Sequence, residues 1–235
     1  MLSRRTFLSL AAAAVPMTRL SAQRSRGATE PPGPLPASIA ALTSMRDRAR
    51  PITADERRAR IENAKRLMAA QKIDAIILAG GTSLNYFTGI RWGNSERLFA
   101  VVIPVVGNPY IVTPAFEEDR TREQLVAGPM AHTDIAVYQE DESPFERVAQ
   151  GLRDRGIATG RIGVEETTKF VFAESVGGAA PALHVTSATP ITAGCRMIKD
   201  AHELDLIRVA CEATLKCYEA VFRALQPAIA MATRA

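Results

Sequence analysis

The segment Asp74–Ala79, apolar after its first residue, constrains the fold more than any other feature of the sequence. It lacks the polar alternation of a strand with one face in water, so it predicts a strand buried on both faces of a sheet. Helices must then cover both faces. One helix is predicted to begin at Thr53, because Glu56 follows at the capping-box position and Ile61 and Ala64 recur at helical spacing.

The rest of the chain alternates between strand and helix patterns. Leu98–Val106 and Tyr110–Val112 predict two strands joined at Gly107-Asn108, a dipeptide typical of hairpin turns. The other predicted elements are strands at Ile135–Tyr138 and Arg161–Val164 and helices from Pro114, over Phe145–Leu152 and over Asp200–Leu225. Together they predict an α/β fold with a mixed β-sheet and helices on both of its faces.

The first 22 residues have the composition of a signal peptide. Arg4 and Arg5 precede a short apolar run, Leu8–Val15, and Ala22 stands at a plausible cleavage point. The run is too short to cross a bilayer as a helix. The Arg pair followed by Phe-Leu resembles the twin-arginine export signal. We therefore expect export to the periplasm or the cell exterior; the alternative is an uncleaved, Arg-rich amphipathic start.

Composition excludes several classes of protein. The chain has 235 residues, of which 47% are hydrophobic and 23% charged, as in globular proteins and unlike disordered or collagen-like chains. Without residues 1–22 the net charge falls from +4 to +1, so the basic balance predicts no nucleic-acid partner. Residues 23–51 contain a Pro-rich stretch and predict an extended linker. No segment predicts a membrane span.

The sequence contains no complete catalytic or metal-binding motif. The three histidines lack the paired spacing of metal ligands. Glu140, Asp141 and Glu142 stand just before a predicted helix, where acids favour the helix dipole and water; metal binding is the alternative there. The remaining candidates are thiols that we interpret as small and buried: Cys195, Cys211 and Cys217.

An ordered series of motifs runs through the chain. Its members are Asn85–Gly89, Arg91–Arg97, Pro114–Glu118, Tyr138–Pro144, Ile162–Glu165 and Arg196–Asp200, the last running into Glu203-Leu204 and Ile207–Ala210. The series resembles the amino-terminal domain of the creatinase/prolidase/aminopeptidase P family. The resemblance extends from Ile52 to Leu225 and includes nearly all of the chain after the leader and linker.

The resemblance implies a two-part protein. Residues 52–198 would form a creatinase-like N-terminal domain, and residues 199–235 a linking helix and the start of a larger "pita-bread" catalytic domain. In peptidase members that larger domain holds two divalent metals, commonly manganese, cobalt or zinc, on two Asp, one His and two Glu. None of these ligands can be placed in this chain, so no catalytic residue, metal or other cofactor is expected in it. The residues after Pro227 depart from the family pattern, and we interpret the chain as a truncated form.

The resemblance also implies one binding residue. In creatinase an Arg lies eight positions after the Gly of a Tyr-Phe-Ser-Gly segment and binds the substrate carboxylate in the neighbouring subunit's active site. The same count from Gly89 reaches Arg97, whose planar guanidinium suits that task. The alternative is a surface Arg paired with Glu96 or another nearby acid. Trp92, in the same loop, is a candidate for stacking on the substrate, with packing as the alternative.

Together with the predicted signal peptide, the resemblance implies the non-catalytic N-terminal domain of an exported Xaa-Pro dipeptidase- or aminopeptidase-like metallopeptidase. Its expected roles are oligomer assembly and the shaping of an active site, with further copies or a catalytic domain as partners. The alternatives are a stand-alone carboxylate-binding or scaffold module and part of a creatinase-type amidinohydrolase. The last predicted helix should expose an apolar stripe that needs a partner surface. The stripe consists of Leu204, Ile207, Cys211, Leu215, Tyr218, Phe222 and Leu225.

Overall fold

The computed structural model describes residues 34–232, which fall into two compact units. The larger unit is Met45–Glu212, and the smaller joins the described residues before Met45 to those after Glu212. The larger unit contains the predicted domain at 52–198. The predicted signal peptide, with Arg4 and Arg5, lies outside the described residues.

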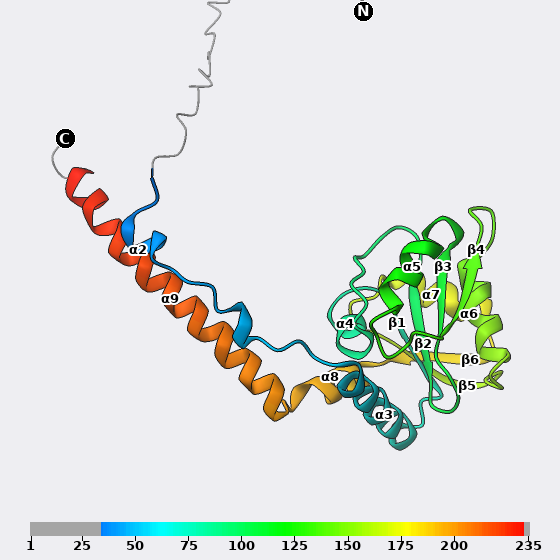
Figure 1. The fold of residues 1–235 in the computed structure, drawn as a ribbon. Coiled ribbons are helices and arrows are strands. Elements are labelled where there is room, and N and C mark those ends of the chain that lie inside the picture. The colour runs from blue at the N-terminus through cyan, green and yellow to red at the C-terminus, as the bar shows by residue number, and fades with distance from the viewer. Residues whose placement is uncertain (1–33, 233–235) are drawn as a thin grey trace, which may run out of the picture. The chain divides into compact units, whose positions relative to one another are not determined.

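The larger unit is built on a mixed sheet whose described strands have the order β4-β3-β2-β1-β5-β6 (Figure 1). Among them, β2 runs antiparallel to its two neighbours, and the other pairs are parallel. Their bounds are β1 (Ala75–Leu78), β2 (Ala100–Pro104), β3 (Tyr110–Pro114), β4 (Asp134–Tyr138), β5 (Gly160–Val164) and β6 (Leu183–Ser187). The predicted mixed sheet and the predicted hairpin, formed by β2 and β3, are confirmed.

Helices cover both faces of this sheet, as predicted. One face packs against α3 (Ala54–Gln71), α4 (Thr82–Thr88), α5 (Glu118–Leu125) and α8 (Thr189–Met197). The other face packs against α6 (Pro144–Arg153) and α7 (Phe170–Ala179). The sheet therefore separates two hydrophobic cores.

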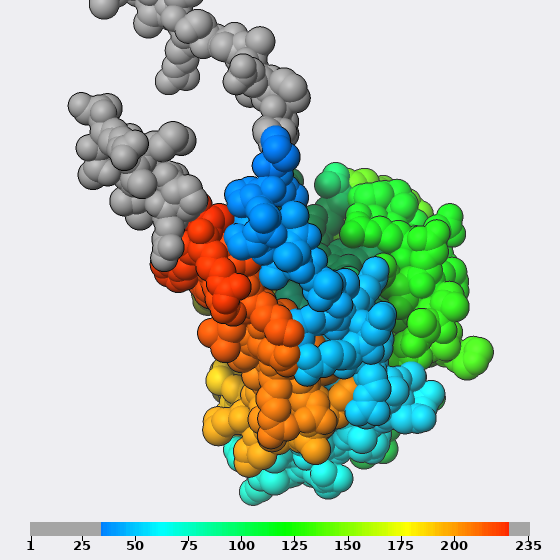
Figure 2. Space-filling model, turned by 60° about the vertical axis from the view of Figure 1, so that its left-hand side comes forward, coloured from blue at the N-terminus to red at the C-terminus, as the bar shows by residue number. Residues whose placement is uncertain are grey.

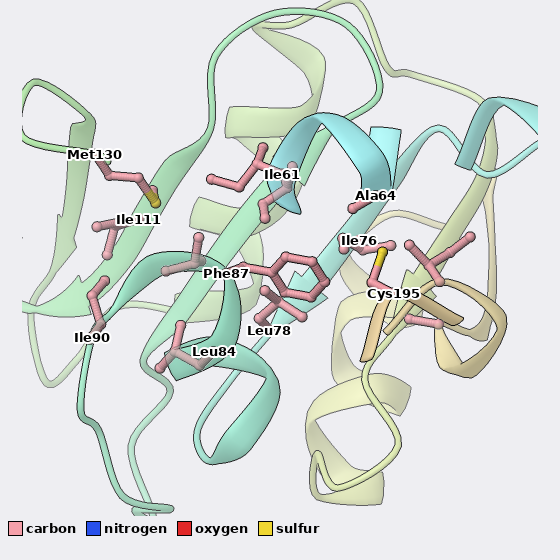
Figure 3. Close-up of a cluster of buried hydrophobic side chains, with 14 of the residues drawn as sticks. Ile61, Ala64, Ile76, Leu78, Leu84, Phe87, Ile90, Ile111, Met130 and Cys195 are labelled. Carbon is pink, nitrogen blue, oxygen red and sulfur yellow. The ribbon is translucent and has the colours of Figure 1, made fainter. Parts of the chain in front are cut away.

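Strand β1 is buried on both faces because its side chains alternate between the two cores. Ile76 and Leu78 enter the core with α3, α4 and α8, where Figure 3 shows Leu78 beside Phe87 of α4. Ala75 and Ile77 enter the core with α6 and α7. All four strand residues are at most 2% exposed. The prediction drawn from the apolar run is confirmed.

The start of α3 has the predicted capping box. The Glu56 backbone N–H donates to Thr53 Oγ1 (3.2 Å), and the Thr53 N–H donates to the Glu56 carboxylate (2.7 Å). These bonds satisfy two donors that the first helical turn would otherwise leave open. Ile61 and Ala64 then lie in the core, as their spacing predicts.

The sequence patterns do not predict α4, α7, β6 or α8. The residues preceding α4 and α7, Gly81 and Lys169, make no side-chain capping bond, so the usual start signal is missing. What holds these helices is burial: Phe87, Phe172 and Ile191 lie in the two cores. Tertiary packing supplies the stability that local sequence does not.

The long helix α9 (Ala201–Ala232) confirms the predicted C-terminal helix, but two thiols on it correct a prediction. Cys195 is buried, whereas Cys211 and Cys217 are exposed. The prediction of three buried thiols is wrong for these two, because on α9 most side chains described face water rather than a core. Exposed apolar side chains accompany them: Leu204, Ile207, Leu215, Tyr218, Val221, Phe222 and Leu225.

Ionic contacts attach the first turns of α9 to the rest of the larger unit. Glu203 pairs with Arg60 of α3 at 2.7 Å, and Glu212 pairs with Arg48 at 2.8 Å. Figure 2 shows the segment after Met45, in light blue, against the orange first part of α9. Residues on both sides of the predicted boundary at 198 therefore belong to one packed body.

The smaller unit contains α2 (Ala37–Ala40) and the second part of α9. Ser38 Oγ donates a hydrogen bond to the Ala220 carbonyl oxygen (2.8 Å), and Ala220 is buried. Within residues 34–232, no helix is long and apolar enough to cross a membrane.

Candidate functional site

The candidate residues lie along one edge of the sheet, here meaning the row of strand ends and not an outer strand. The carboxyl ends of β1, β3, β4, β5 and β6 reach this edge, together with the amino end of β2, because β2 runs in the opposite direction. Loops at the carboxyl ends of α/β sheets are the usual position of binding sites. The segment between Gly89 and Phe99, which contains Trp92 and Arg97, crosses this edge before β2 begins.

Contacts from two neighbouring strand ends hold this segment in place. The Gly81 N–H, just after β1, donates to the Trp92 carbonyl oxygen (3.1 Å). Lys169 Nζ, after β5, donates to the Ser95 carbonyl oxygen (3.0 Å). A Cβ atom on Gly80 would stand 2.6 Å from Asn94 Oδ1 and 3.2 Å from the Trp92 carbonyl oxygen, so the segment packs closely on the chain that follows β1. The backbone from Trp92 to Ser95 is thus held by the residues that follow β1 and β5.

Trp92 lies in the core at this edge rather than on the surface. Its side chain is stacked on Phe99, with ring centroids 4.0 Å apart, and only 6% of the residue is exposed. The Arg120 guanidinium lies over the ring, 4.1 Å from its centroid. These contacts are those of a packing residue, and the described arrangement leaves little of the ring for stacking on a ligand.

Arg97 is exposed and forms a two-pronged ion pair. Its Nε donates to Glu140 Oε1 (2.7 Å), and its Nη2 donates to Glu140 Oε2 (2.8 Å). The Arg97 side chain is 47% exposed, and the exposed Phe116 ring lies 5.4 Å from the guanidinium carbon. The hydrogen bonds lower the pKa of Glu140 and raise the pKa of Arg97. Arg97 therefore pairs with Glu140, not with its neighbour Glu96.

The loop that carries Glu140 is itself well ordered by hydrogen bonds. Tyr138, at the end of β4, donates its hydroxyl to the Leu98 carbonyl oxygen (3.0 Å). Burial raises the pKa of Tyr138 to about 12, so it keeps this proton at physiological pH. The Gln139 N–H donates to Glu142 Oε2 (2.8 Å), which closes the turn around Glu140. The two loops that hold Arg97 and Glu140 are thus joined by Tyr138 as well as by the ion pair.

The guanidinium retains free donors toward solvent. Among residues 34–232, Arg97 Nη1 donates to no protein atom, and Nη2 has a second N–H beyond the one given to Glu140. One edge of the planar group is therefore engaged, and the edge formed by Nη1 and Nη2 can receive a second carboxylate.

The pairing of Arg97 with Glu140 could not be read from the sequence. The two residues are 43 positions apart, one before β2 and one after β4, and β3 lies between these strands. The acids 140–142 were visible as a cluster before a helix. The described structure uses Glu140 for Arg97 and Glu142 for Gln139 and Arg147.

The described residues do not offer a metal site. Within 34–232, no three His, Cys, Asp or Glu side chains are grouped so that they could hold a metal ion. The two divalent metals that the resemblance implies for a catalytic domain therefore have no ligand set in this part of the chain.

The comparisons with known proteins agree with this fold. Residues 60–198 match the family model of the creatinase/prolidase N-terminal domain. An uncharacterised peptidase of Schizosaccharomyces pombe is 29% identical over 180 residues, which are 70% of this chain and 37% of that protein.

Two solved structures are similar in fold. Dipeptidase PepE from Mycobacterium ulcerans has a TM-score of 0.59 and 25% identity over 66% of this chain and 40% of that one. The N-terminal domain of an Xaa-Pro dipeptidase from Lactobacillus brevis has a TM-score of 0.51 and 18% identity, over 59% of this chain and 98% of that one. At that identity the second likeness shows the fold alone.

The matched relatives are longer than the region they share with this chain. The chain spans about two fifths of the length of the first three curated relatives, with shares of 37% and 42%. The family model, however, covers more than half of the chain. The chain therefore belongs to the creatinase/prolidase N-terminal domain family, whose fold it shares with Xaa-Pro peptidases.

Proposed function

We propose that this chain acts as the non-catalytic N-terminal domain of an exported Xaa-Pro dipeptidase- or aminopeptidase-like metallopeptidase. The match of residues 60–198 to the creatinase/prolidase N-terminal domain carries the proposal. In this role the domain assembles an oligomer and shapes the mouth of an active site. Its partners are further copies of the chain or a catalytic domain that supplies the metal ligands.

Within that role, Arg97 is the binding residue. Arg97 stands at the carboxyl ends of the strands, on a segment held by Gly81 and Lys169. The Nη1–Nη2 side of its guanidinium is not used by Glu140. A planar guanidinium with two free donors on one edge suits the carboxylate of a peptide or of a small amino-acid derivative. Trp92 supports the segment by packing on Phe99.

The binding role can be tested with a substrate-like dipeptide. Ala-Pro is titrated into the ¹⁵N-labelled chain, with Ala-Pro amide as the ligand that lacks the carboxylate. We expect signals near Arg97 to shift with Ala-Pro only, and Arg97→Ala to abolish the shifts. Arg122→Ala is the matched control, because Arg122 is an exposed, ion-paired arginine on α5. Equal shifts with both ligands, or shifts unaffected by Arg97→Ala, would contradict the role.

The non-catalytic role has its own test. The purified chain should release no proline from Ala-Pro when manganese or cobalt is added, because the described residues provide no metal cage. Release of proline above a buffer blank that disappears with a chelator would overturn this part of the proposal.

The open edge of Arg97 also favours a second candidate, a stand-alone carboxylate-binding module. The site is ordered by contacts within the larger unit, so it does not need another domain to form. A module would bind Ala-Pro without associating with a catalytic domain. A creatinase-type parent would instead be recognised by a preference for creatine over Ala-Pro in the same titration.

A further inference from the structure

We infer that Glu140 is a positioning residue for Arg97: it holds one edge of the guanidinium so that the other edge faces an incoming carboxylate. The inference rests on the carboxylate-binding role proposed for Arg97 and assigns a function to an acid that nothing else in the site explains. It also specifies the geometry of the ligand, which must approach the Nη1–Nη2 edge end-on.

The geometry of the pair supports this assignment. A guanidinium presents two edges that can each make two parallel hydrogen bonds to a carboxylate. Glu140 uses the side edge, with Nε at 2.7 Å from Oε1 and Nη2 at 2.8 Å from Oε2. The end edge, Nη1 with the second N–H of Nη2, is left without a partner among residues 34–232. Glu140 and an external carboxylate therefore occupy different edges and do not compete for the same donors.

The support behind Glu140 is rigid. The Tyr138 hydroxyl donates to the Leu98 carbonyl oxygen, so the residue after Arg97 is tied to one that lies two positions before Glu140. Glu142 accepts from the Gln139 N–H (2.8 Å) and from Arg147 Nη2 (2.6 Å), which fixes the turn on which Glu140 stands. These bonds place the backbone of Glu140 beside the Arg97 segment, so its carboxylate can orient the guanidinium.

Arg97 is restrained on its own side too. Its backbone N–H donates to Ser95 Oγ (3.3 Å), and the Ser95 carbonyl oxygen accepts from Lys169 Nζ (3.0 Å). The Phe116 ring, 5.4 Å from the guanidinium carbon, limits where the planar group can swing. Without Glu140, however, the long side chain would rotate freely in water and would lose that freedom only when a ligand binds.

This loss of freedom sets the size of the expected effect. Immobilising one long side chain on binding costs about 0.5–1.5 kcal/mol, which converts to about 2- to 12-fold in affinity. The repulsion between Glu140 and the ligand carboxylate works in the opposite direction. It is weak because both groups are in water, where screening is strong. Positioning should therefore dominate, and Glu140 should improve binding.

The test combines binding with a spectroscopic readout of the arginine side chain. The dissociation constant for Ala-Pro is measured on the chain and on Glu140→Gln, Glu140→Asp and Glu146→Gln. Glu146 is an exposed acid on α6 that is not paired with Arg97, so its variant controls for the lost charge. In the same samples, the ¹⁵N signal of the Arg97 Nε–H reports whether the guanidinium is held.

We expect Glu140→Gln to weaken Ala-Pro binding about 3- to 10-fold and to broaden or shift the Arg97 Nε–H signal. Glu140→Asp, which keeps the charge, should recover part of both effects, and Glu146→Gln should change neither. Unchanged or tighter binding by Glu140→Gln overturns the inference. If Arg97→Ala binds Ala-Pro normally, the proposed function fails instead, and the Nε–H signal still shows whether Glu140 orders Arg97.

Discussion

Arg60 of α3 and Glu203 of α9 form an ion pair of 2.7 Å in which the side chains are only 9% and 12% exposed. Arg60 Nη1 also donates to the Tyr86 carbonyl oxygen (3.1 Å), and its guanidinium lies 4.0 Å from the centre of the Tyr86 ring. Glu203 further accepts from the Asp200 N–H at the start of α9. A buried charge pair thus fixes the first turn of α9 to the α/β unit.

Removing one member of this pair should be costly. Glu203→Gln leaves the buried Arg60 charge without its counter-ion, and breaking a buried pair in this way costs about 3–5 kcal/mol of unfolding free energy. The control is Asp205→Asn, which removes the acid of the exposed Arg208–Asp205 pair on the same helix. There we expect a change below about 1 kcal/mol. Denaturant unfolding measures both, and equal losses for the two variants would contradict the prediction.

The contact between His202 Nδ1 and Glu56 Oε1, 2.6 Å apart, should make stability depend on pH. The hydrogen bond to Glu56 raises the pKa of His202. The contribution of His202 to the free energy of unfolding is therefore complete below its unfolded-state pKa of about 6.5, and it is lost as the pH rises through the pKa of the folded state. Hydrogen bonds from the Thr53 N–H, the largest cause, and from His202 lower the pKa of Glu56 to about 2. The contribution of Glu56 to the free energy of unfolding is therefore lost only as the pH falls from about 4.3 toward 2.

The pair should therefore contribute most between about pH 4.5 and 6.5. We expect the difference in unfolding free energy between the chain and His202→Gln to be largest near pH 5.5 and to shrink toward pH 8. His184→Gln, at an exposed position on β6, is the control. A difference that is constant from pH 5 to 8 would show that His202 acts through packing alone.

Gly151 in α6 should not tolerate alanine. A Cβ atom there would stand 2.3 Å from Cε2 of the buried Tyr110 ring, whose hydroxyl is held by the Val148 carbonyl oxygen at 2.6 Å. We expect the overpacking to cost about 1–3 kcal/mol despite the better helix propensity of alanine. Gly178→Ala in α7, where the added Cβ meets nothing within 4 Å beyond its chain neighbours and the helix's own backbone, should instead be neutral or stabilising by up to about 1 kcal/mol. The midpoint temperature of thermal unfolding should fall for Gly151→Ala and stay equal or rise for Gly178→Ala. An equal shift in both variants would contradict the prediction.

The exposed apolar side chains on the second part of α9 should drive self-association. Leu215 and Phe222 are both more than 60% exposed, and each such side chain forgoes roughly 1.5–3 kcal/mol of burial in water. We expect sedimentation to show concentration-dependent oligomers that are reduced by Leu215→Gln with Phe222→Gln. Glu219→Gln, on an exposed ion pair with Arg223, should leave association unchanged. A monomer at all concentrations would show that the stripe does not bind another copy.

If the predicted leader directs export, that export should depend on its paired arginines, Arg4 and Arg5. The sequence there resembles a twin-arginine signal, so replacing both Arg4 and Arg5 by Lys should leave the protein in the cytoplasm of a bacterium that has this pathway. Cell fractionation and immunoblotting distinguish the outcomes. Normal export of the double variant would make the Arg pair incidental and favour the general secretory route.

The sequence alone determined the elements whose signals are local. The apolar run at β1, the capping box formed by Thr53 and Glu56 and the Gly107-Asn108 turn each act through neighbours in the chain. Burial on both faces and the mixed sheet could therefore be predicted, and the family was indicated separately by the ordered series of motifs that resembles it. Short segments such as α4 and α7 could not, because their stability comes from Phe87 and Phe172 entering cores built by distant residues.

Only the tertiary structure decided what surrounds the candidate residues. Trp92 and Arg97 stand five positions apart, yet one ring is stacked on Phe99 in the core and the other side chain pairs with Glu140 at the surface. Cys211 is exposed, against the prediction, because its surroundings are likewise set by how the elements pack. A side chain's burial and its ion-pair partner depend on which strands and helices pack beside it, and local sequence patterns contain no such information.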